Sequence, residues 1–351
     1  QQPSKIVSYS TISGTLSQGN FSDGIWTKTV LDEIKSFGDK LVISKEGNVG
    51  IGNTNPHAPL QFSNSVVNRK VVLYDANNND HQYYGFGING GALRYQVDAP
   101  GASHAFFAGT GPGSSNELMR IKGNGNLGIG TTTPAARLHV ADSAVLFTGS
   151  PTILNVGTNY NQAPPVEGAG TRMMWYPVRG AFRSGFVNNT NWDKVNTGIL
   201  SFATGYNSMA SDFFSFASGE ETQATGKAAF SSGELTQAKG DASFSSGLGT
   251  FARAYAGLSI GAFNDSTDNP SSFNMNADDR TFQIGNGNFS TRSNAITVLR
   301  NGNTGIGTVT PNAPLQFTNI TASRKIVLWE LANNDHQFYG FGINGATLRY
   351  Q

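Results

Sequence analysis

Apolar, glycine and alanine positions recur every 14 residues between Ser201 and Ala262. A period this short, with one large apolar residue per copy, predicts a coil of short β-strands with one turn per repeat. The large apolar column, whose rings we expect to stack, is Phe202, Phe216, Phe230, Phe244 and Leu258. The glycine column, predicted to form the tight corners, is Gly205, Gly219, Gly233, Gly247 and Gly261. The alanine column, predicted to leave no room for larger side chains, is Ala210, Ala224, Ala238 and Ala252.

Because one such coil has little interior, we expect it to associate with copies of itself. A second, longer repeat relates residues 47–96 to residues 302–351 without a gap. Since the first copy continues beyond the part that is repeated, we expect the natural protein to extend past Gln351.

A glycine-rich motif, which we call a joint, occurs three times: GNVGIGNTNP at 47–56, GNGNLGIGTTTP at 123–134 and GNTGIGTVTP at 302–311. Asn and Gly tolerate positive φ, so each joint is predicted to link a preceding apolar strand through a hairpin turn to a second short strand. The isoleucine between two glycines suggests a place where three backbones approach an axis closely.

Only one segment has helical periodicity. In TKTVLDEIKSFGDK, residues 27–40, the apolar residues Val30, Ile34 and Phe37 share one face of a helix, and Gly38 ends it. We predict a short helix there, either in a three-helix bundle at the start of a fibre or on the surface of a small β-domain.

These patterns divide the chain into six parts. They are an N-terminal segment with the short helix (1–45), a first fibre module (46–140), a β-insert (141–200), the β-roll of 14-residue repeats (201–263), a connector (264–300) and the start of a second fibre module (301–351).

The composition favours an all-β fold with many short strands. Of 351 residues, 43 are glycine and 23 are phenylalanine, which we expect to fill the core. The formal net charge is +1 and only 13% of residues are charged, which argues against nucleic acid as a partner.

No apolar run approaches the ~20 residues of a membrane-spanning helix, and there is no cysteine to form disulfides. The start QQPSK resembles a chain end left by signal-peptide removal, so we expect export.

The chemistry-bearing motifs favour structural roles. The joint at 123–134 has the glycine density of a nucleotide loop, but Thr and Pro follow where a phosphate-binding helix must begin. DANNNDHQ at 75–82 suggests a calcium loop, yet it lacks the glycine and glutamate that an EF-hand requires, and a solvated hairpin turn is the preferred interpretation. Asp80 and His81 are sequence neighbours that point to opposite faces, and no G-x-S-x-G motif accompanies them.

We therefore predict no catalytic residue, no metal site and no cofactor. A histidine shared by symmetry copies on an axis and a carboxylate pair between subunits stay open as alternatives.

An aromatic and basic group precedes the β-roll, and it comprises Trp175, Tyr176, Arg179, Phe182, Arg183 and Trp192. Aromatic faces beside arginine suit stacking on sugars and contacts to carboxylates. The candidate ligand-binding residues are therefore Trp175, Tyr176, Arg179 and Trp192. The alternative, which we favour, is that the group forms the core of the β-insert, because nothing else there is large enough to build one.

Two sets of motifs resemble known fibrous proteins. SFASGEETQATGKAAF and SSGELTQAKGDASF resemble the head repeats of trimeric autotransporter adhesins, although Asp212 stands where later repeats carry glycine. The joints resemble linkers in phage tail fibres and in fibre-like surface proteins of Bacteroidetes, as do GAGTRMMWYP, AFRSGF, NWDK and FQIGNGN. The resemblance implies an elongated homotrimeric fibre with a left-handed β-roll and small β modules.

The resemblance also implies a function. It is that of a non-catalytic extracellular or cell-surface fibre, displaying a head and stalk for attachment to a surface, a cell or a glycan. Its partners would be copies of itself and a surface glycan or host receptor, without nucleic acid or membrane insertion. Two alternatives are a tail fibre or receptor-binding fibre of a phage or contractile injection system, located on the virion or the tail, and a subunit of a homopolymeric extracellular filament with end-to-end contacts.

Overall fold

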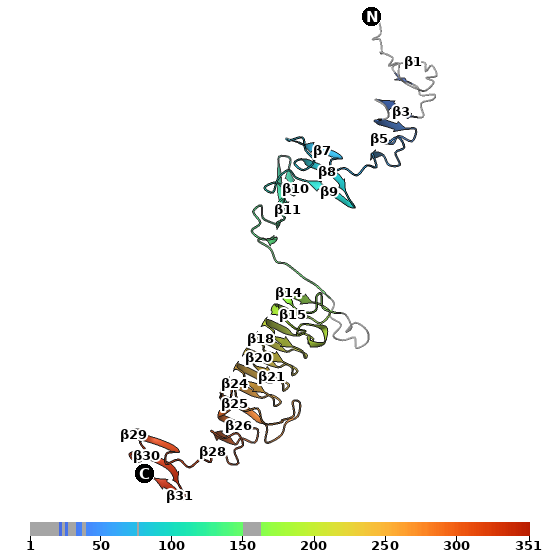
Figure 1. Ribbon diagram of the computed structural model, residues 1–351. Coiled ribbons are helices and arrows are strands. Elements are labelled where there is room, and N and C mark those ends of the chain that lie inside the picture. The colour runs from blue at the N-terminus through green and yellow to red at the C-terminus, as the bar shows by residue number, and fades with distance from the viewer. Residues whose placement is uncertain (1–20, 23–24, 27–32, 37–39, 76, 150–162) are drawn as a thin grey trace. The chain divides into compact units, whose positions relative to one another are not determined.

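The computed structural model describes residues 21–22, 25–26, 33–36, 40–75, 77–149 and 163–351 (Figure 1). The chain divides into two compact units, Gln1–Leu146 and Phe147–Gln351. Strands and turns dominate the described residues, whose one helical element is a single 3-10 turn, η1 (Lys194–Asn196). The predicted all-β class is confirmed.

Each joint lies in a group of four consecutive paired strands, which we call a joint sheet. The first comprises β3 (Glu33–Ser36), β4 (Leu41–Ser44), β5 (Val49–Ile51) and β6 (Leu60–Phe62). The second comprises β10 (Ser103–Gly111), β11 (Ser114–Lys122), β12 (Leu127–Ile129) and β13 (Leu138–Val140). The third comprises β25 (Arg280–Asn286), β26 (Asn294–Leu299), β27 (Thr304–Ile306) and β28 (Leu315–Phe317). In each sheet the predicted hairpin is antiparallel, and a parallel strand that the sequence did not indicate follows it.

One side-chain contact closes all three joints in the same way. The Asn48 side-chain amide donates to the Pro56 carbonyl at 3.1 Å. The same distance separates the equivalent pairs Asn126–Pro134 and Asn303–Pro311. The proline is buried, and a Cβ on the middle glycine, Gly50, would stand 2.1 Å from the Asn53 carbonyl oxygen. The closeness of the Asn53 carbonyl therefore explains why glycine is needed at this position. An approach of three backbones is not needed to explain it.

The helix predicted within residues 27–40 is wrong where the structure describes it. Residues 27–32 and 37–39 lie outside the described residues, and Glu33–Ser36 form β3, which pairs antiparallel with β4. Backbone hydrogen bonding to the edge of the first joint sheet overrides the helical spacing of apolar residues, because local propensity is weaker than such tertiary pairing.

Each copy of the long repeat adds a three-stranded antiparallel meander after its joint. The first meander comprises β7 (Val71–Tyr74), β8 (Tyr84–Asn89) and β9 (Ala92–Gln96). The second comprises β29 (Ile326–Glu330), β30 (Phe338–Asn344) and β31 (Thr347–Tyr350). Nearer the N-terminus, β1 (Phe21–Ser22) pairs with β2 (Ile25–Trp26).

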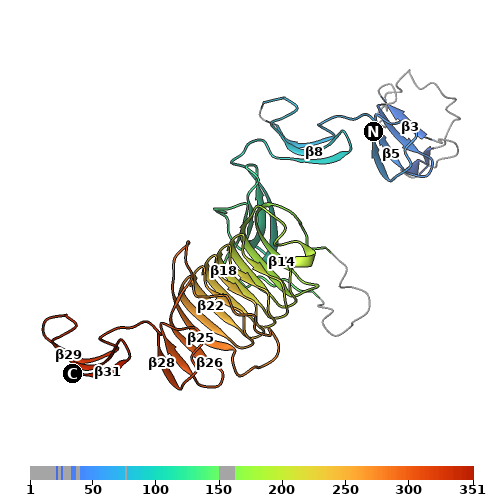
Figure 2. The same ribbon diagram turned by 60° about the horizontal axis from the view of Figure 1, so that its bottom comes forward.

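A β-solenoid forms most of the second unit (Figures 1 and 2). Its main sheet runs through β14 (Gly170–Tyr176), β15 (Ala181–Val187), β16 (Phe202–Tyr206), β18 (Phe216–Glu220), β20 (Phe230–Glu234), β22 (Phe244–Leu248) and β24 (Leu258–Ala262), and continues through the third joint sheet to make eleven strands. A second sheet comprises β17 (Met209–Ala210), β19 (Gln223–Ala224), β21 (Gln237–Ala238) and β23 (Phe251–Ala252). From β15 to β25 the main strands pair in parallel, with like residues opposite one another.

Between β16 and β24 the interior of the solenoid holds only small side chains along its rungs. The buried columns include Ala203, Ala217, Ser231, Ser245 and Ser259, the alanines from Ala210 to Ala252, and Thr222, Thr236 and Thr250. Each phenylalanine precedes an inward-pointing residue and so points outward. Phe244, for example, is 38% exposed.

The phenylalanine rings stack as predicted. Phe202, Phe216, Phe230 and Phe244 have successive ring centroids 4.9, 4.8 and 4.7 Å apart, with planes within 5° of parallel. We call this column the phenylalanine ladder. The expectation that phenylalanine fills the core is wrong for the ladder, because the rings lie on the outside of the coil.

The predicted glycine corners are also wrong, because the glycine column lies within the strands. Gly219 has a φ of +126°, and a Cβ there would stand 2.0 Å from the Gly233 carbonyl oxygen of the next rung. The corners instead use residues with positive φ just outside the strands: Leu200, Phe214, Ala228, Ala242 and Ala256 in one column, and Asn207, Glu221, Leu235, Gly249 and Phe263 in another. The glycine column therefore allows neighbouring rungs to stack closely, and it does not form the corners of the coil.

Gly219→Ala should destabilise the solenoid by about 2–4 kcal/mol, because it adds both backbone strain and overlap with the next rung. Chemical denaturation followed by circular dichroism measures the loss. Gly113→Ala is the control, since a Cβ at Gly113 meets nothing within 4 Å. Equal unfolding midpoints for the two variants would contradict the packing described.

Candidate functional site

Two of the four candidate ligand residues are core side chains. Tyr176 and Trp192 are 2% and 0% exposed, and the Trp192 indole N–H donates to the Ser208 carbonyl at 2.9 Å. The Arg172 guanidinium stands 5.4 Å from the centre of the Trp192 ring. These contacts agree with the favoured interpretation of the group as a core at the start of the solenoid.

The other two candidates reach the surface. Trp175 is 42% exposed. Arg179 donates to the Thr197 carbonyl, lies 6.0 Å from the Tyr176 ring, and lines a hollow of about 190 Å³ together with Asp212. A ligand role for Trp175 and Arg179 stays a prediction.

Arg183 lies inside the solenoid, one rung before Ala203. Its guanidinium donates to the Ser201 hydroxyl and to the Ala210 carbonyl, both at 2.9 Å. No ion pair joins it to a carboxylate in the described part of the chain. Burial, with a smaller contribution from the nearby charge of Arg179, lowers the pKa of Arg183 to about 9. The side chain closes the end of the interior by bonding to rung carbonyls.

The loop after β24 brings two carboxylates to one arginine. Arg280 Nη1 lies 2.5 Å from Asp265 Oδ1 and 3.8 Å from Asp268 Oδ1, and Arg253 lies 3.9 Å from Asp268. Burial raises the pKa of Asp268. At Asp265 burial also acts to raise the pKa, but hydrogen bonds from Thr267 and Arg280 outweigh it and the pKa is lowered. Each carboxylate faces a cation of its own chain, so the cluster ties this loop to the solenoid.

The DANNNDHQ segment is a turn held by its own side chains. The Asp75 carboxylate accepts the backbone N–H groups of Asn77 and Asn78 at 3.2 and 2.7 Å and pairs with Arg69. The carboxylate is therefore used within the turn. Among the residues that the structure describes, no three His, Cys, Asp or Glu side chains gather closely enough to hold a metal ion. No helix in the described ranges has the length and apolar character to cross a membrane.

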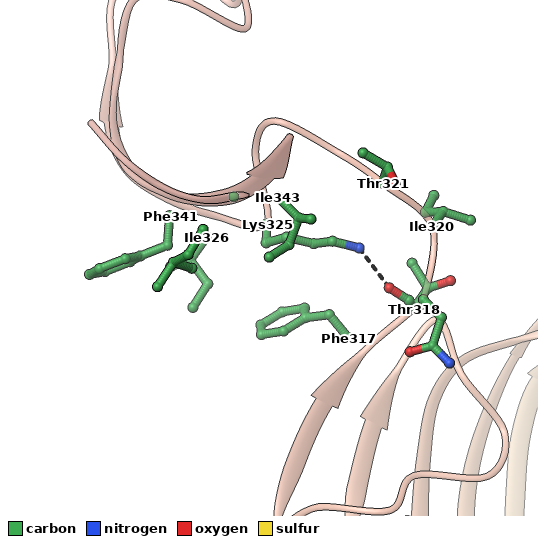
Figure 3. Close-up of a pocket in the computed structure, with 11 residues that line it drawn as sticks. Phe317, Thr318, Ile320, Thr321, Lys325, Ile326, Phe341 and Ile343 are labelled. Carbon is green, nitrogen blue, oxygen red and sulfur yellow. Dashed lines mark hydrogen bonds between the residues drawn. The ribbon is translucent and has the colours of Figure 1, made fainter. Parts of the chain in front are cut away.

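A hollow of about 360 Å³ lies between the third joint and the second meander (Figure 3). Its apolar lining is Phe317, Ile320, Ile326, Phe341, Ile343 and Leu348. Lys325 Nζ reaches across and donates to the Thr318 carbonyl at 2.6 Å, as Figure 3 shows. In the first copy of the repeat Lys70 makes the same contact with Ser63, at 2.5 Å. The lysine contact is therefore a shared feature of both modules.

Each meander leaves large apolar side chains exposed. In the first these include Tyr74, Leu93 and Tyr95, which are 60–67% exposed, and in the second Trp329, Tyr339, Leu348 and Tyr350, which are 54–80% exposed. Exposed apolar surface of this kind on a single layer of three strands marks an interaction site. These surfaces were not among the predicted sites, although the alternation of glycine and apolar residues in YYGFGING indicates a one-sided strand.

No protein-family model matches the chain, and no curated protein matches it either. The resemblances drawn from the repeats and joints therefore stay expectations, and the function has to be argued from the geometry.

Arg183→Ala should lower the free energy of unfolding by about 3 kcal/mol, because it removes charged hydrogen bonds, leaves the Ala210 carbonyl without this donor and opens a cavity. Thermal and denaturant unfolding measure the loss. Lys227→Ala, at an exposed position, is the matched control. An unchanged unfolding midpoint for Arg183→Ala would show that the guanidinium does not support the interior.

Proposed function

We propose that this chain is a non-catalytic structural subunit of an extracellular attachment fibre. The observation that carries the proposal is the continuous sheet of eleven strands, in which each rung is hydrogen-bonded to the next. The phenylalanine ladder adds a second continuous contact along the same stack. A β-solenoid built in this way is compatible with a fibre-like protein, because the stack is rigid along its length.

The described charged groups support the non-catalytic part of the proposal. Arg183, Asp265 and Asp268 have shifted pKa values of the kind found at active sites. Each of them, however, is held by hydrogen bonds or ion pairs that fasten one part of the solenoid to another.

The exposed apolar surfaces support self-association. The open faces of the meanders leave several large side chains facing water in a single chain, and the phenylalanine ladder adds half-buried rings that end at Phe244, which is 38% exposed. Surfaces of this kind mark interaction sites. We infer that other copies of the chain cover them. Three parts of the proposal rest on the resemblance to adhesin heads and fibre linkers. They are the number of three copies, the extracellular location and the attachment to a surface, cell or glycan.

Sedimentation velocity of the purified chain, followed by electron microscopy, tests the proposed function. We expect a particle whose mass is a multiple of 37.2 kDa and whose frictional ratio is that of an elongated rod. A compact monomer of 37.2 kDa would contradict the proposal.

Phe230→Asp should both destabilise the solenoid and weaken self-association, because it breaks the ladder and places a charge on a surface proposed to be covered. Melting temperature and sedimentation report the two effects. Ser290→Asp introduces the same charge at an exposed loop position and should change neither. If Phe230→Asp melts and sediments like the parent, no other copy of the chain covers the ladder and the proposed contact is wrong.

A further inference from the structure

Each of the three joint sheets has one face that its own loop leaves open. The opposite face is covered by the loop that the asparagine–proline contact holds. Strand alternation and register place six residues of the first joint on the open face, namely Leu41, Ile43, Val49, Ile51, Leu60 and Phe62. The matching positions of the other two joints are also apolar, except for Thr304. We call this surface the joint face.

The same positions are exposed to the same extent in all three joint faces. The isoleucines between the glycines, Ile51, Ile129 and Ile306, are 41, 39 and 41% exposed. The leucines of the parallel strand, Leu60, Leu138 and Leu315, are 54, 56 and 54% exposed. A single exposed leucine needs no explanation, but the same apolar pair repeated at three places indicates a common partner.

We propose that the joint faces are self-association surfaces, each packing against the same joint of another copy of this chain. The proposal rests on the proposed fibre function and names where its subunits meet. A partner that covers all three faces must carry three matching surfaces at the spacing of this sequence. A second copy of the chain meets that requirement.

The distribution of charge around the joints favours the same partner. When identical surfaces meet about a symmetry axis, the side chains close to the axis approach their own counterparts, so a charge there would face a like charge. Residues 47–62 and 302–317 contain no Lys, Arg, Asp or Glu, and neither do the preceding strands β4 and β26. In the second joint sheet the preceding strand β11 carries Glu117, Arg120 and Lys122, and Glu117 is paired with Arg120. The one such charge within 123–140 is Arg137, whose guanidinium donates to the Asn124 carbonyl of its own joint at 2.5 Å.

Crosslinking through a single thiol tests the proposal, because the chain contains no cysteine. Ile306→Cys places the thiol on the third joint face, and Thr310→Cys places it on the exposed loop that covers the other side of the same joint. Both full-length variants are treated with a short bis-maleimide and run on a denaturing gel. We expect covalent multiples of the 37.2 kDa chain from Ile306→Cys and none from Thr310→Cys.

The outcomes separate this inference from the proposed function. If the parent sediments as an oligomer and Ile306→Cys gives no more crosslinked product than Thr310→Cys, the joint faces are not the contact and the fibre proposal stands. If the parent sediments as a compact monomer, both proposals fall.

A triple substitution gives an independent readout. Leu60→Ser, Leu138→Ser and Leu315→Ser combined should shift the sedimenting mass toward the single chain while the circular dichroism spectrum stays that of a β protein. The control combines Leu118→Ser, Leu146→Ser and Leu331→Ser, three leucines outside the joint faces that are 53, 83 and 83% exposed. Equal dissociation of the two triple variants, or none in either, would overturn the proposal.

Discussion

Between β16 and β24 the interior of the solenoid holds no large apolar side chain, and this constraint places the phenylalanine of each repeat on the outside. Alanine, serine and threonine fill the rungs, and longer polar side chains are buried only next to them, as at Arg183 and Gln283. A phenylalanine ring in each repeat must therefore lie outside, where it packs on the ring of the next rung at less than 5 Å. The rungs stabilise one another, and the apolar cluster that they enclose is built of alanines alone.

In the joints and meanders as well, the chain itself covers only one face of each small sheet. In each joint the chain folds its own loop over one face of a small sheet, and the buried proline and the middle glycine make that cover fit. In each meander, glycines on the middle strand let backbone approach one face: a Cβ on Gly87 would stand 1.6 Å from the Asn68 carbonyl oxygen. The remaining faces are apolar and open. A protein in which every module is covered on one side only suits assembly from several copies.

Sequence periodicity was enough to predict strands that stack in register, because like residues at a fixed phase have few other arrangements. It did not predict which column faces inward, since Phe216 and Ala217 recur with the same period; only the small size of alanine distinguishes them. The corners were misassigned to Gly219 and its equivalents because residues such as Glu221 and Leu235, which adopt positive φ there, are not typical of that conformation. The helix predicted around Ile34 failed because the apolar strand β4 was predicted, but no local pattern shows that residues 33–36 pair with it.

Hydroxyl-radical footprinting tests most directly the claim that the large apolar side chains lie outside the coil and are covered by other copies. Labelling of Phe202, Phe216 and Phe230 is compared between concentrated and highly diluted protein, with the buried Trp192 as an internal reference. The account predicts that the phenylalanines are protected in the concentrated sample and become labelled on dilution, while Trp192 stays protected in both. Phenylalanines that are labelled to the same extent at every concentration would contradict it.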